Sequence, residues 1–254
     1  MTWRTQRRLI YGVAVIFVVA SAVLYIYRDN FFPVPTCFDK KQNGYESGID
    51  CGGTCSLRCT QEVSPLTVLW SRALKTSNNT YDLVTMVSNK NINNASRALG
   101  YTFNVYDGYG SLVTTISGTT TAPVDSDFPI IVQNVTLTKR PKDVVTQLMD
   151  GPHYTVKELP TSPTIRQTSV HYEAGDIPRV YATITNTKRI TISNLPVRVV
   201  LFDEFNNALG VGQTIIPFLD KEGVQEISFT WDAPFAKDPS KIIIYPIFDP
   251  FLSN

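Results

Sequence analysis

Histidine is scarce in this chain, and the short motifs that mark common catalytic sites are missing. Only His153 and His171 are present among 254 residues, and neither lies near an acid and a nucleophile in a triad-like pattern. The chain contains no H-E-x-x-H, no G-x-S-x-G and no P-loop. The glycine-rich segment Gly108–Ser111 is interpreted as a hairpin turn, because no helix pattern follows it to supply an anion site. The sequence therefore favours a protein that is not an enzyme.

An excess of charge of either sign is also missing. The chain has 23 Lys and Arg against 22 Asp and Glu, a formal net charge of +1, and no segment forms a basic stripe. This balance argues against nucleic acid as a partner. No pattern in the sequence identifies a small-molecule substrate either.

Charge is absent altogether from Leu9–Tyr27, a run of nineteen residues. A helix of that length covers about 28 Å, close to the hydrocarbon thickness of a bilayer. Arg4, Arg7 and Arg8 precede the run, so the positive-inside rule predicts a cytoplasmic N-terminus and export of everything after the span. The alternative is a cleaved signal peptide with its small-residue site at Ala20–Ala22. The apolar run continues beyond that site, which favours a retained single-pass anchor in the plasma membrane.

Cysteine is absent from the last 195 residues. All four cysteines fall within 23 residues, at Cys37, Cys51, Cys55 and Cys59. An even number of cysteines in an exported segment predicts two disulfides, with three connectivities open. Each short loop is expected to restrain the unfolded chain by about 2–3 kcal/mol, which stabilises a segment too small to bury its own core.

Oxygen-bearing side chains are interspersed among the glycines of this cysteine segment. Asp39, Asn43, Glu46 and Asp50 have the spacing of a candidate calcium site, since calcium takes six to eight oxygen ligands. The alternative is that these side chains cap turns and are solvated. Zinc fits less well, because the spacing C-x13-C-x3-C-x3-C lacks paired C-x2-C motifs and the predicted compartment oxidises thiols. No other cofactor is predicted.

The segment from Cys37 to Cys55 reads CFDKKQNGYESGIDCGGTC. It resembles the C-x-D-x3-N-x2-E-x3-D-C-G-G-x-C module of exported, often membrane-tethered proteins of bacteria and some protists. The resemblance implies a location outside the cytoplasm and does not imply an activity.

Long helical periodicity is missing after Thr60. Short runs rich in Val, Ile, Thr, Tyr and Phe alternate there with Asn, Asp, Gly and Pro, the pattern of an all-β protein. The candidate strands are Leu66–Leu74, Tyr81–Val87, Tyr101–Tyr106, Phe128–Leu137, Val180–Thr185, Val197–Phe202, Gly223–Trp231 and Ile242–Phe248. Alternating residues in two of these strands are expected to present one apolar face each to a core. These residues are Tyr101, Phe103 and Val105 in one strand, and Val197, Val199 and Leu201 in the other.

The β-rich part also repeats itself at an offset close to 97 residues. Asn89 aligns with Asn186, and Tyr106-Asp107 aligns with Phe202-Asp203. We expect each aspartate to accept backbone N–H groups and open a tight turn. A repeat of this length indicates a duplicated domain, and seven or so strands in about 95 residues match an immunoglobulin-like sandwich.

Both copies resemble the FxLYD-type domain, a small immunoglobulin-like module of bacterial exported proteins. The resemblance rests on strands that end in Val-Tyr-Asp and Leu-Phe-Asp, on the upstream Asn89 and Asn186, and on Gly210-Val-Gly212 in the second copy. The first copy has Thr114-Thr115 in place of that glycine pair. The family implies a fold and a place at the cell surface, but no substrate.

These observations predict an all-β protein with two tandem immunoglobulin-like β-sandwiches after one transmembrane helix and a small disulfide-stapled module. The expected segments are a cytoplasmic tail (1–8), the transmembrane helix (9–27), the cysteine-rich module (28–62), sandwich one (63–150), a proline-containing linker (151–163) and sandwich two (164–254). The linker suggests sandwiches arranged in series as a rod. The predicted function is a non-catalytic interaction or scaffold module with a protein partner in a cell-envelope assembly. The alternative is a calcium- or ligand-dependent adhesion or sensing module.

Overall fold

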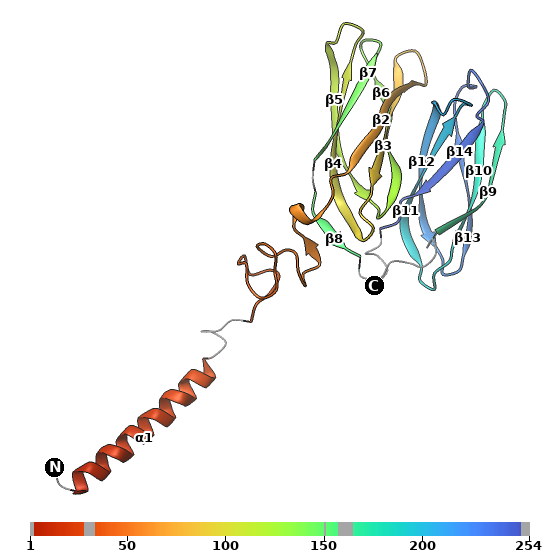
Figure 1. The fold of residues 1–254 in the computed structure, drawn as a ribbon. Coiled ribbons are helices and arrows are strands. Elements are labelled where there is room, and N and C mark those ends of the chain that lie inside the picture. The colour runs from red at the N-terminus through yellow and green to blue at the C-terminus, as the bar shows by residue number, and fades with distance from the viewer. Residues whose placement is uncertain (1–2, 28–33, 150, 157–164, 250–254) are drawn as a thin grey trace. The chain divides into compact units, whose positions relative to one another are not determined.

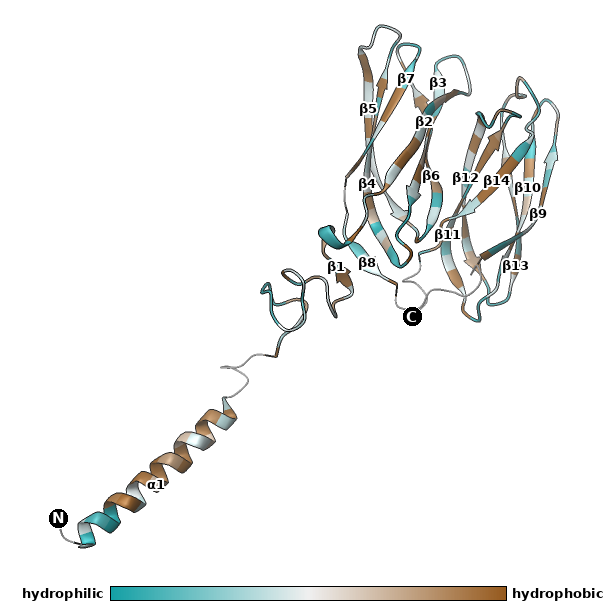
Figure 2. Cartoon of the chain, viewed as in Figure 1, coloured by the Kyte–Doolittle hydropathy of each residue, from teal (hydrophilic) through white to brown (hydrophobic). Residues whose placement is uncertain are grey.

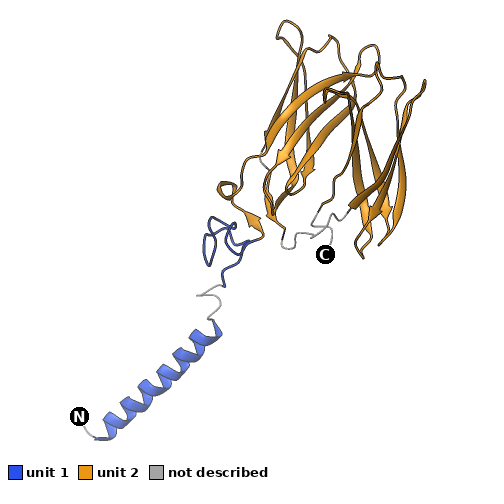
Figure 3. Cartoon of the chain, turned by 45° about the vertical axis from the view of Figure 1, so that its right-hand side comes forward, with its two compact units in different colours: residues 1–55 blue, residues 56–254 orange. Residues whose placement is uncertain are grey.

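The computed structural model describes residues 3–27, 34–149, 151–156 and 165–249. Its contacts divide the chain into two compact units, residues 1–55 (unit 1) and 56–254 (unit 2), shown in Figure 3. Unit 1 contains the one helix of the described chain that is long and apolar enough to cross a membrane, α1 (Trp3–Ile26). Figure 2 shows that apolar residues cover this helix on all visible sides beyond its first turns. A helix that is apolar all round suits a lipid environment better than water.

Unit 2 is built from antiparallel β-sheets, as Figure 1 shows. A short strand β1 (Leu57–Arg58) and a 3-10 turn η1 (Thr60–Glu62) precede the first sandwich. The strands of the first sandwich are β2 (Thr67–Lys75), β3 (Thr80–Asn89), β4 (Asn94–Tyr106), β5 (Leu112–Ala122), β6 (Ser126–Thr136), β7 (Asp143–Met149) and β8 (His153–Thr155). The strands of the second sandwich are β9 (Ile165–Glu173), β10 (Arg179–Asn186), β11 (Ile192–Phe202), β12 (Ala208–Leu219), β13 (Val224–Thr230) and β14 (Lys241–Pro246). The predicted sandwich-like all-β fold after one apolar helix and a disulfide-bonded module is thus confirmed.

The two sandwiches share one strand order. In the first, β2-β3-β6 form one sheet and β4 lies between β5 and β7 in the other. In the second, β9-β10-β13 form one sheet and β11 lies between β12 and β14. The first sandwich differs at the start of β4, where Asn94–Ser96 pair with β8, and β8 pairs in turn with β1. Strand β8 lies inside the segment predicted as a linker, and residues 157–163 of that segment lie outside the described residues.

Each sandwich has its own apolar core, formed by alternating residues of its strands. Phe103 and Val105 are fully buried in the first core, and Tyr101 packs against it. In the second core, Val197, Val199 and Leu201 are fully buried. The predicted apolar faces of β4 and β11 are therefore confirmed, as expected for strands whose side chains alternate between two faces.

Strands β3 and β11 are buried on both faces. Val84 and Met86 of β3 point away from the first core and pack with Val200 and Phe202 of β11 in a third buried cluster. An edge-to-face contact between the rings of Trp70 and Phe202, with centroids 6.3 Å apart, extends it. This cluster joins the outer faces of the two sheets, which places the sandwiches side by side within unit 2 (Figure 1). A rod in which the sandwiches meet only through a linker is therefore wrong for unit 2.

Candidate functional site

The cysteine module carries the site residues that the sequence predicted. Cys37 is bonded to Cys55, with Cα atoms 5.8 Å apart, and Cys51 and Cys59 are disulfide-bonded as well. None of the four is a free thiol. Because glycines and turns dominate residues 34–55, the segment has little regular structure beyond the bridge between Gly48 and Cys51. The disulfides therefore take the place of an apolar core there.

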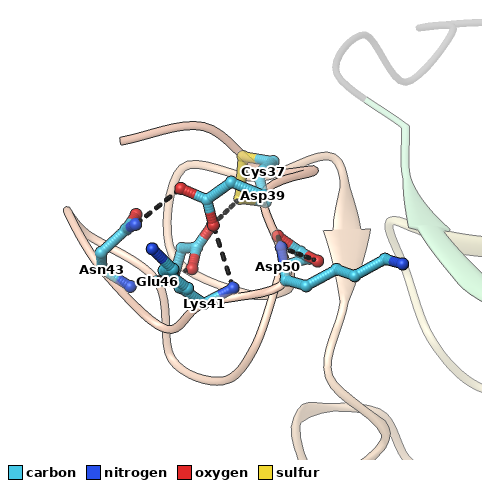
Figure 4. The surroundings of a disulfide bond; sticks show 8 residues. Cys37, Asp39, Lys41, Asn43, Glu46 and Asp50 are labelled. Atoms are coloured by element: carbon cyan, nitrogen blue, oxygen red, sulfur yellow. Dashed lines mark hydrogen bonds between the residues drawn. A yellow bond between two sulfur atoms is a disulfide. The ribbon is translucent and has the colours of Figure 1, made fainter. Parts of the chain in front are cut away.

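Figure 4 shows how the predicted oxygen ligands lie around this disulfide. Both carboxylate oxygens of Asp50 accept the backbone N–H of Lys40, at 3.0 and 2.9 Å. Asp39 accepts the backbone N–H of Lys41 at 2.9 Å and the side-chain amide of Asn43 at 2.7 Å. The hydrogen bond from Asn43 is the largest cause that lowers the pKa of Asp39.

Glu46 completes the set by holding the turn that begins at Asn43. Its Oε2 accepts the backbone N–H of Asn43 at 3.1 Å, and the carbonyl oxygen of Asn43 accepts the N–H of Glu46 at 3.2 Å. The four predicted ligands thus lie in one small loop system, and each carboxylate accepts at least one backbone N–H. This arrangement is the turn-capping role that the sequence left open beside calcium.

The other cluster in the module that resembles a metal site consists of Cys37, Glu46 and Cys55. Their ligand atoms lie within 4.8 Å of one another. Since the two sulfurs form a disulfide, neither can bind a metal as a thiolate. The cluster is therefore part of the module's covalent framework.

In unit 2, the repeated asparagines end equivalent strands and make equivalent hydrogen bonds. Asn89 ends β3, where its amide nitrogen donates to the carbonyl oxygens of Asn94 and Pro123 and its oxygen accepts the N–H of Asn91. Asn186 ends β10, and both side chains are buried. The side-chain nitrogen of Asn186 donates to the carbonyl oxygens of Ile190, Leu219 and Asp220. Its side-chain oxygen accepts the N–H of Lys188. Each amide ties a strand end to the following loop and to a distant turn.

The repeated aspartates open the predicted tight turns. Asp107 Oδ1 accepts the N–H groups of Tyr109 and Ser111 at 3.0 and 2.9 Å, and its Oδ2 accepts Lys139 Nζ at 3.0 Å. The hydrogen bond from Lys139 is the largest cause that lowers the pKa of Asp107. The turn predicted for this segment is thereby confirmed.

Asp203 has the same role after β11. Its Oδ1 accepts the N–H groups of Phe205 and Asn207 at 2.8 and 2.7 Å. The backbone N–H of Asn207 is the largest cause that lowers the pKa of Asp203. The turns that follow the central strands of the two sandwiches therefore have the same pattern of hydrogen bonds to an aspartate.

No protein-family model and no curated protein matches the chain. Among solved structures, a transglutaminase from red sea bream aligns at a TM-score of 0.24 and 10% identity, over 73% of this chain and 31% of that one. The chain thus spans less than a third of the enzyme's length, and a likeness at this TM-score carries no argument about fold or activity.

Two features of unit 2 were missed by the sequence analysis. The first is Arg198, whose guanidinium crosses between the sandwiches to the carbonyl oxygen of Pro129 at 2.5 Å and to Thr120 Oγ1 at 3.0 Å. Burial lowers the pKa of Arg198 to about 10. A single arginine in an apolar strand pattern gave no signal of this role, because the docking partner lies 69 residues away.

The second missed feature is a cationic loop at one end of the first sandwich. The loop between β6 and β7 carries Lys139, Arg140 and Lys142 around Pro141, next to the turn opened by Asp107. The concentration of three cations in four residues was the available signal in a chain of balanced charge.

Proposed function

We propose that this chain is a single-pass membrane protein that presents the two sandwiches of unit 2 as a non-catalytic interaction module of a cell-envelope assembly. In this proposal the N-terminus is cytoplasmic and the chain beyond α1 is exported. The observation that supports this proposal most strongly is an N-terminal apolar helix long enough to span a bilayer, in a chain whose four cysteines are all oxidised. A 24-residue helix covers about 36 Å, enough for a bilayer core, and paired cysteines belong to oxidising compartments.

The docking of the two sandwiches supports an interaction role. The third apolar cluster covers the outer faces of two sheets, so the outer faces of the other two sheets, the sheet edges and the end loops are the surfaces left for partners. A docked pair also presents those surfaces in a fixed arrangement, which reduces the entropy lost when a partner binds. The resemblance of both copies to FxLYD-type immunoglobulin-like domains agrees with such a module.

Membrane anchoring is tested by alkaline extraction of membranes from cells that express the full chain. We expect the protein to stay with the membrane and its unit 2 to be digested by protease added from the exported side. The control variant carries Val15→Lys and Val18→Lys, because a charge at the centre of a span disfavours insertion by about 3 kcal/mol each. Extraction of the unaltered chain into the soluble fraction contradicts the anchor.

The interaction role is tested separately by cross-linking in native membranes, followed by affinity purification and mass spectrometry. We expect a stoichiometric protein partner linked to lysines of unit 2, such as Lys188 or Lys221. Recovery of the chain alone, at monomer size and from intact membranes, contradicts the scaffold role while leaving the anchor in place.

A further inference from the structure

A hollow of about 610 Å³ lies at the end of the first sandwich, between the β4–β5 turn and the β6–β7 loop. Its lining residues are Asp107, Gly108, Tyr109, Lys139, Arg140, Pro141 and Lys142. The volume lies within the range of about 300–1,000 Å³ that is typical of small-molecule sites. Three of the lining side chains are cations and only one is an anion.

The two loops that form this hollow are held together by specific hydrogen bonds. Asp107 binds the N–H groups of its own turn through Oδ1 and Lys139 of the other loop through Oδ2. The backbone N–H of Lys142 donates to the carbonyl oxygen of Tyr106 at 2.8 Å. The ring of Pro141 further restricts the backbone between the cations. The backbone of the hollow is therefore held in place before a ligand binds, which reduces the cost of ordering the loops.

The single carboxylate of the hollow is already engaged. Asp107 is buried and neutralises Lys139. Arg140 and Lys142 are exposed, and neither forms an ion pair in the part of the chain that the structure describes. Asp143 follows at the start of β7 but does not line the hollow. Two positive charges are thus uncompensated at the rim.

The second sandwich provides an internal comparison at the equivalent place. There Lys237 pairs with Glu204 at 3.7 Å, and its ammonium lies 5.9 Å from the centre of the Phe205 ring. Lys237 is thus compensated within the chain. At the first end, the equivalent aromatic residue Tyr109 is 96% exposed and lies near Arg140 and Lys142, which form no ion pair among the described residues.

We propose that this hollow binds the phosphate groups of an anionic polymer. Arginine matches the geometry of a phosphate with two parallel hydrogen bonds, and lysine adds a mobile positive charge. The exposed ring of Tyr109 offers an apolar face and a hydroxyl to the part of the ligand that links successive phosphates. The hollow is larger than one phosphate ion, which favours a repeating phosphate-bearing chain. The inference extends the proposed interaction module by naming the chemistry of one partner.

The test measures binding of fluorescein-labelled polyphosphate to the full chain in zwitterionic nanodiscs by fluorescence anisotropy. We expect saturable binding that weakens as salt is raised, since exposed charges are screened within about 10 Å at 0.1 M salt. The double variant Arg140→Glu/Lys142→Glu is expected to weaken binding at least tenfold, and Tyr109→Ala about threefold, because one rim contact is lost without a change of charge.

The matched control carries the same charge change at the other sandwich, Lys237→Glu/Lys241→Glu. It is expected to leave the affinity within about twofold, since those lysines lie outside the hollow. Equal loss in the two double variants would mean attraction by net charge alone and overturns the proposal. Absence of saturable binding overturns it as well.

A last arm separates a polymer from a lipid surface. Vesicles that contain phosphatidylglycerol are mixed with the same nanodiscs, and co-sedimentation is measured. Binding to vesicles without binding to soluble polyphosphate overturns the polymer assignment.

If polyphosphate binding is lost in the Arg140 and Lys142 variant while the cross-linked protein partner is retained, the two roles are independent. Failure of the cross-linking experiment alone leaves the phosphate site standing.

Discussion

The first and second sandwiches of unit 2 share the asparagine and the aspartate that hold their strand ends and turns, and they differ in the residues at their ends. Both have three strands in one sheet and a central strand, β4 or β11, flanked by two neighbours in the other. Asn89 and Asn186 close equivalent strand ends, and Asp107 and Asp203 open equivalent turns. The shared residues satisfy backbone groups that would otherwise be buried without partners.

The differences lie where water or a partner can reach. The first sandwich has the additional strand β8 along β4 and a cationic hollow at its end, whereas at the end of the second sandwich Lys237 pairs with Glu204. Residues that hold the backbone are therefore common to the two sandwiches, and residues that face outward are not. This division suggests that stability depends on the first set of residues and partner binding on the second, so substitutions can change stability and binding separately.

The largest expected effect comes from the apolar cluster that joins the sandwiches. Val200 and Val199 are neighbours in β11, but Val200 lies in the shared cluster and Val199 in the second core. Val200→Asp places an uncompensated carboxylate between the sheets and is expected to disfavour docking by about 4 kcal/mol. We expect calorimetry to show one unfolding transition for the unaltered chain and two for this variant.

The neighbouring substitution Val199→Asp is the control for this experiment. It is expected to unfold the second sandwich outright, which NMR detects as loss of dispersed signals from β9–β14 only. If Val200→Asp also removes those signals, the cluster is part of the second core and not an interface between two separable sandwiches.

A smaller effect is expected from the paired amides. Asn89→Ala and Asn186→Ala each leave buried or partly buried carbonyl oxygens and one N–H group without their partners. Each substitution should lower the free energy of unfolding by about 3 kcal/mol, measured by urea denaturation. Asn104→Ala, on an exposed face of β4, is the control and should lower it by less than about 1 kcal/mol. If only one of the two substitutions lowers the free energy of unfolding, the two asparagines do not have the same structural role.

Much of this fold could be predicted from the sequence because its signals are local. The uncharged run predicted α1, and alternation of apolar residues predicted β4 and β11. Strands such as β5, which reads LVTTISGTTTA, were missed because threonine and glycine blur the alternation. The docking of β3 on β11 was missed because consecutive apolar residues such as Val199 and Val200 indicate burial on two faces but do not name the partner.

Among the candidate sites, too, those that depend on local sequence could be predicted and those that depend on distant contacts could not. The turn roles of Asp107 and Asp203 were predictable, since an aspartate after a strand binds N–H groups two and four residues ahead. The cationic hollow was not, because it joins loops more than thirty residues apart. The calcium prediction for Asp39, Asn43, Glu46 and Asp50 remains a prediction. The three carboxylates bind backbone N–H groups and the amide of Asn43 binds Asp39, which accounts for their spacing without a metal.

The two turns should also make the stability of the chain depend on pH. The pKa values of Asp107 and Asp203 are lowered in the folded chain. Each therefore contributes stability that is full above the unfolded pKa of about 4 and is lost as pH falls through the lowered folded pKa. Asp107→Asn and Asp203→Asn should each differ from the unaltered chain most at neutral pH and least in acid, as followed by urea denaturation across pH.

The lysines next to these turns should lower the pKa values of the two aspartates by different amounts. Lys139 is the main cause of the shift of Asp107, whereas a backbone N–H is the main cause for Asp203. Lys139→Met should raise the pKa of Asp107 clearly, and Lys237→Met should raise that of Asp203 less. NMR titration of the two carboxyl carbons measures both values, and equal shifts would contradict the assigned causes.

The smallest expected effect is the loss of the ion pair that compensates the second end. Lys237 and Glu204 are both about two-thirds exposed and lie 3.7 Å apart, so solvent screens their attraction. Lys237→Met should therefore change the free energy of unfolding by less than about 0.5 kcal/mol. The same variant leaves the negative charge of Glu204 without a partner at the end of the second sandwich. We therefore expect no polyphosphate to bind at that end. Gain of polyphosphate binding in Lys237→Met would mean that an exposed aromatic ring, and not the uncompensated cations, selects the ligand.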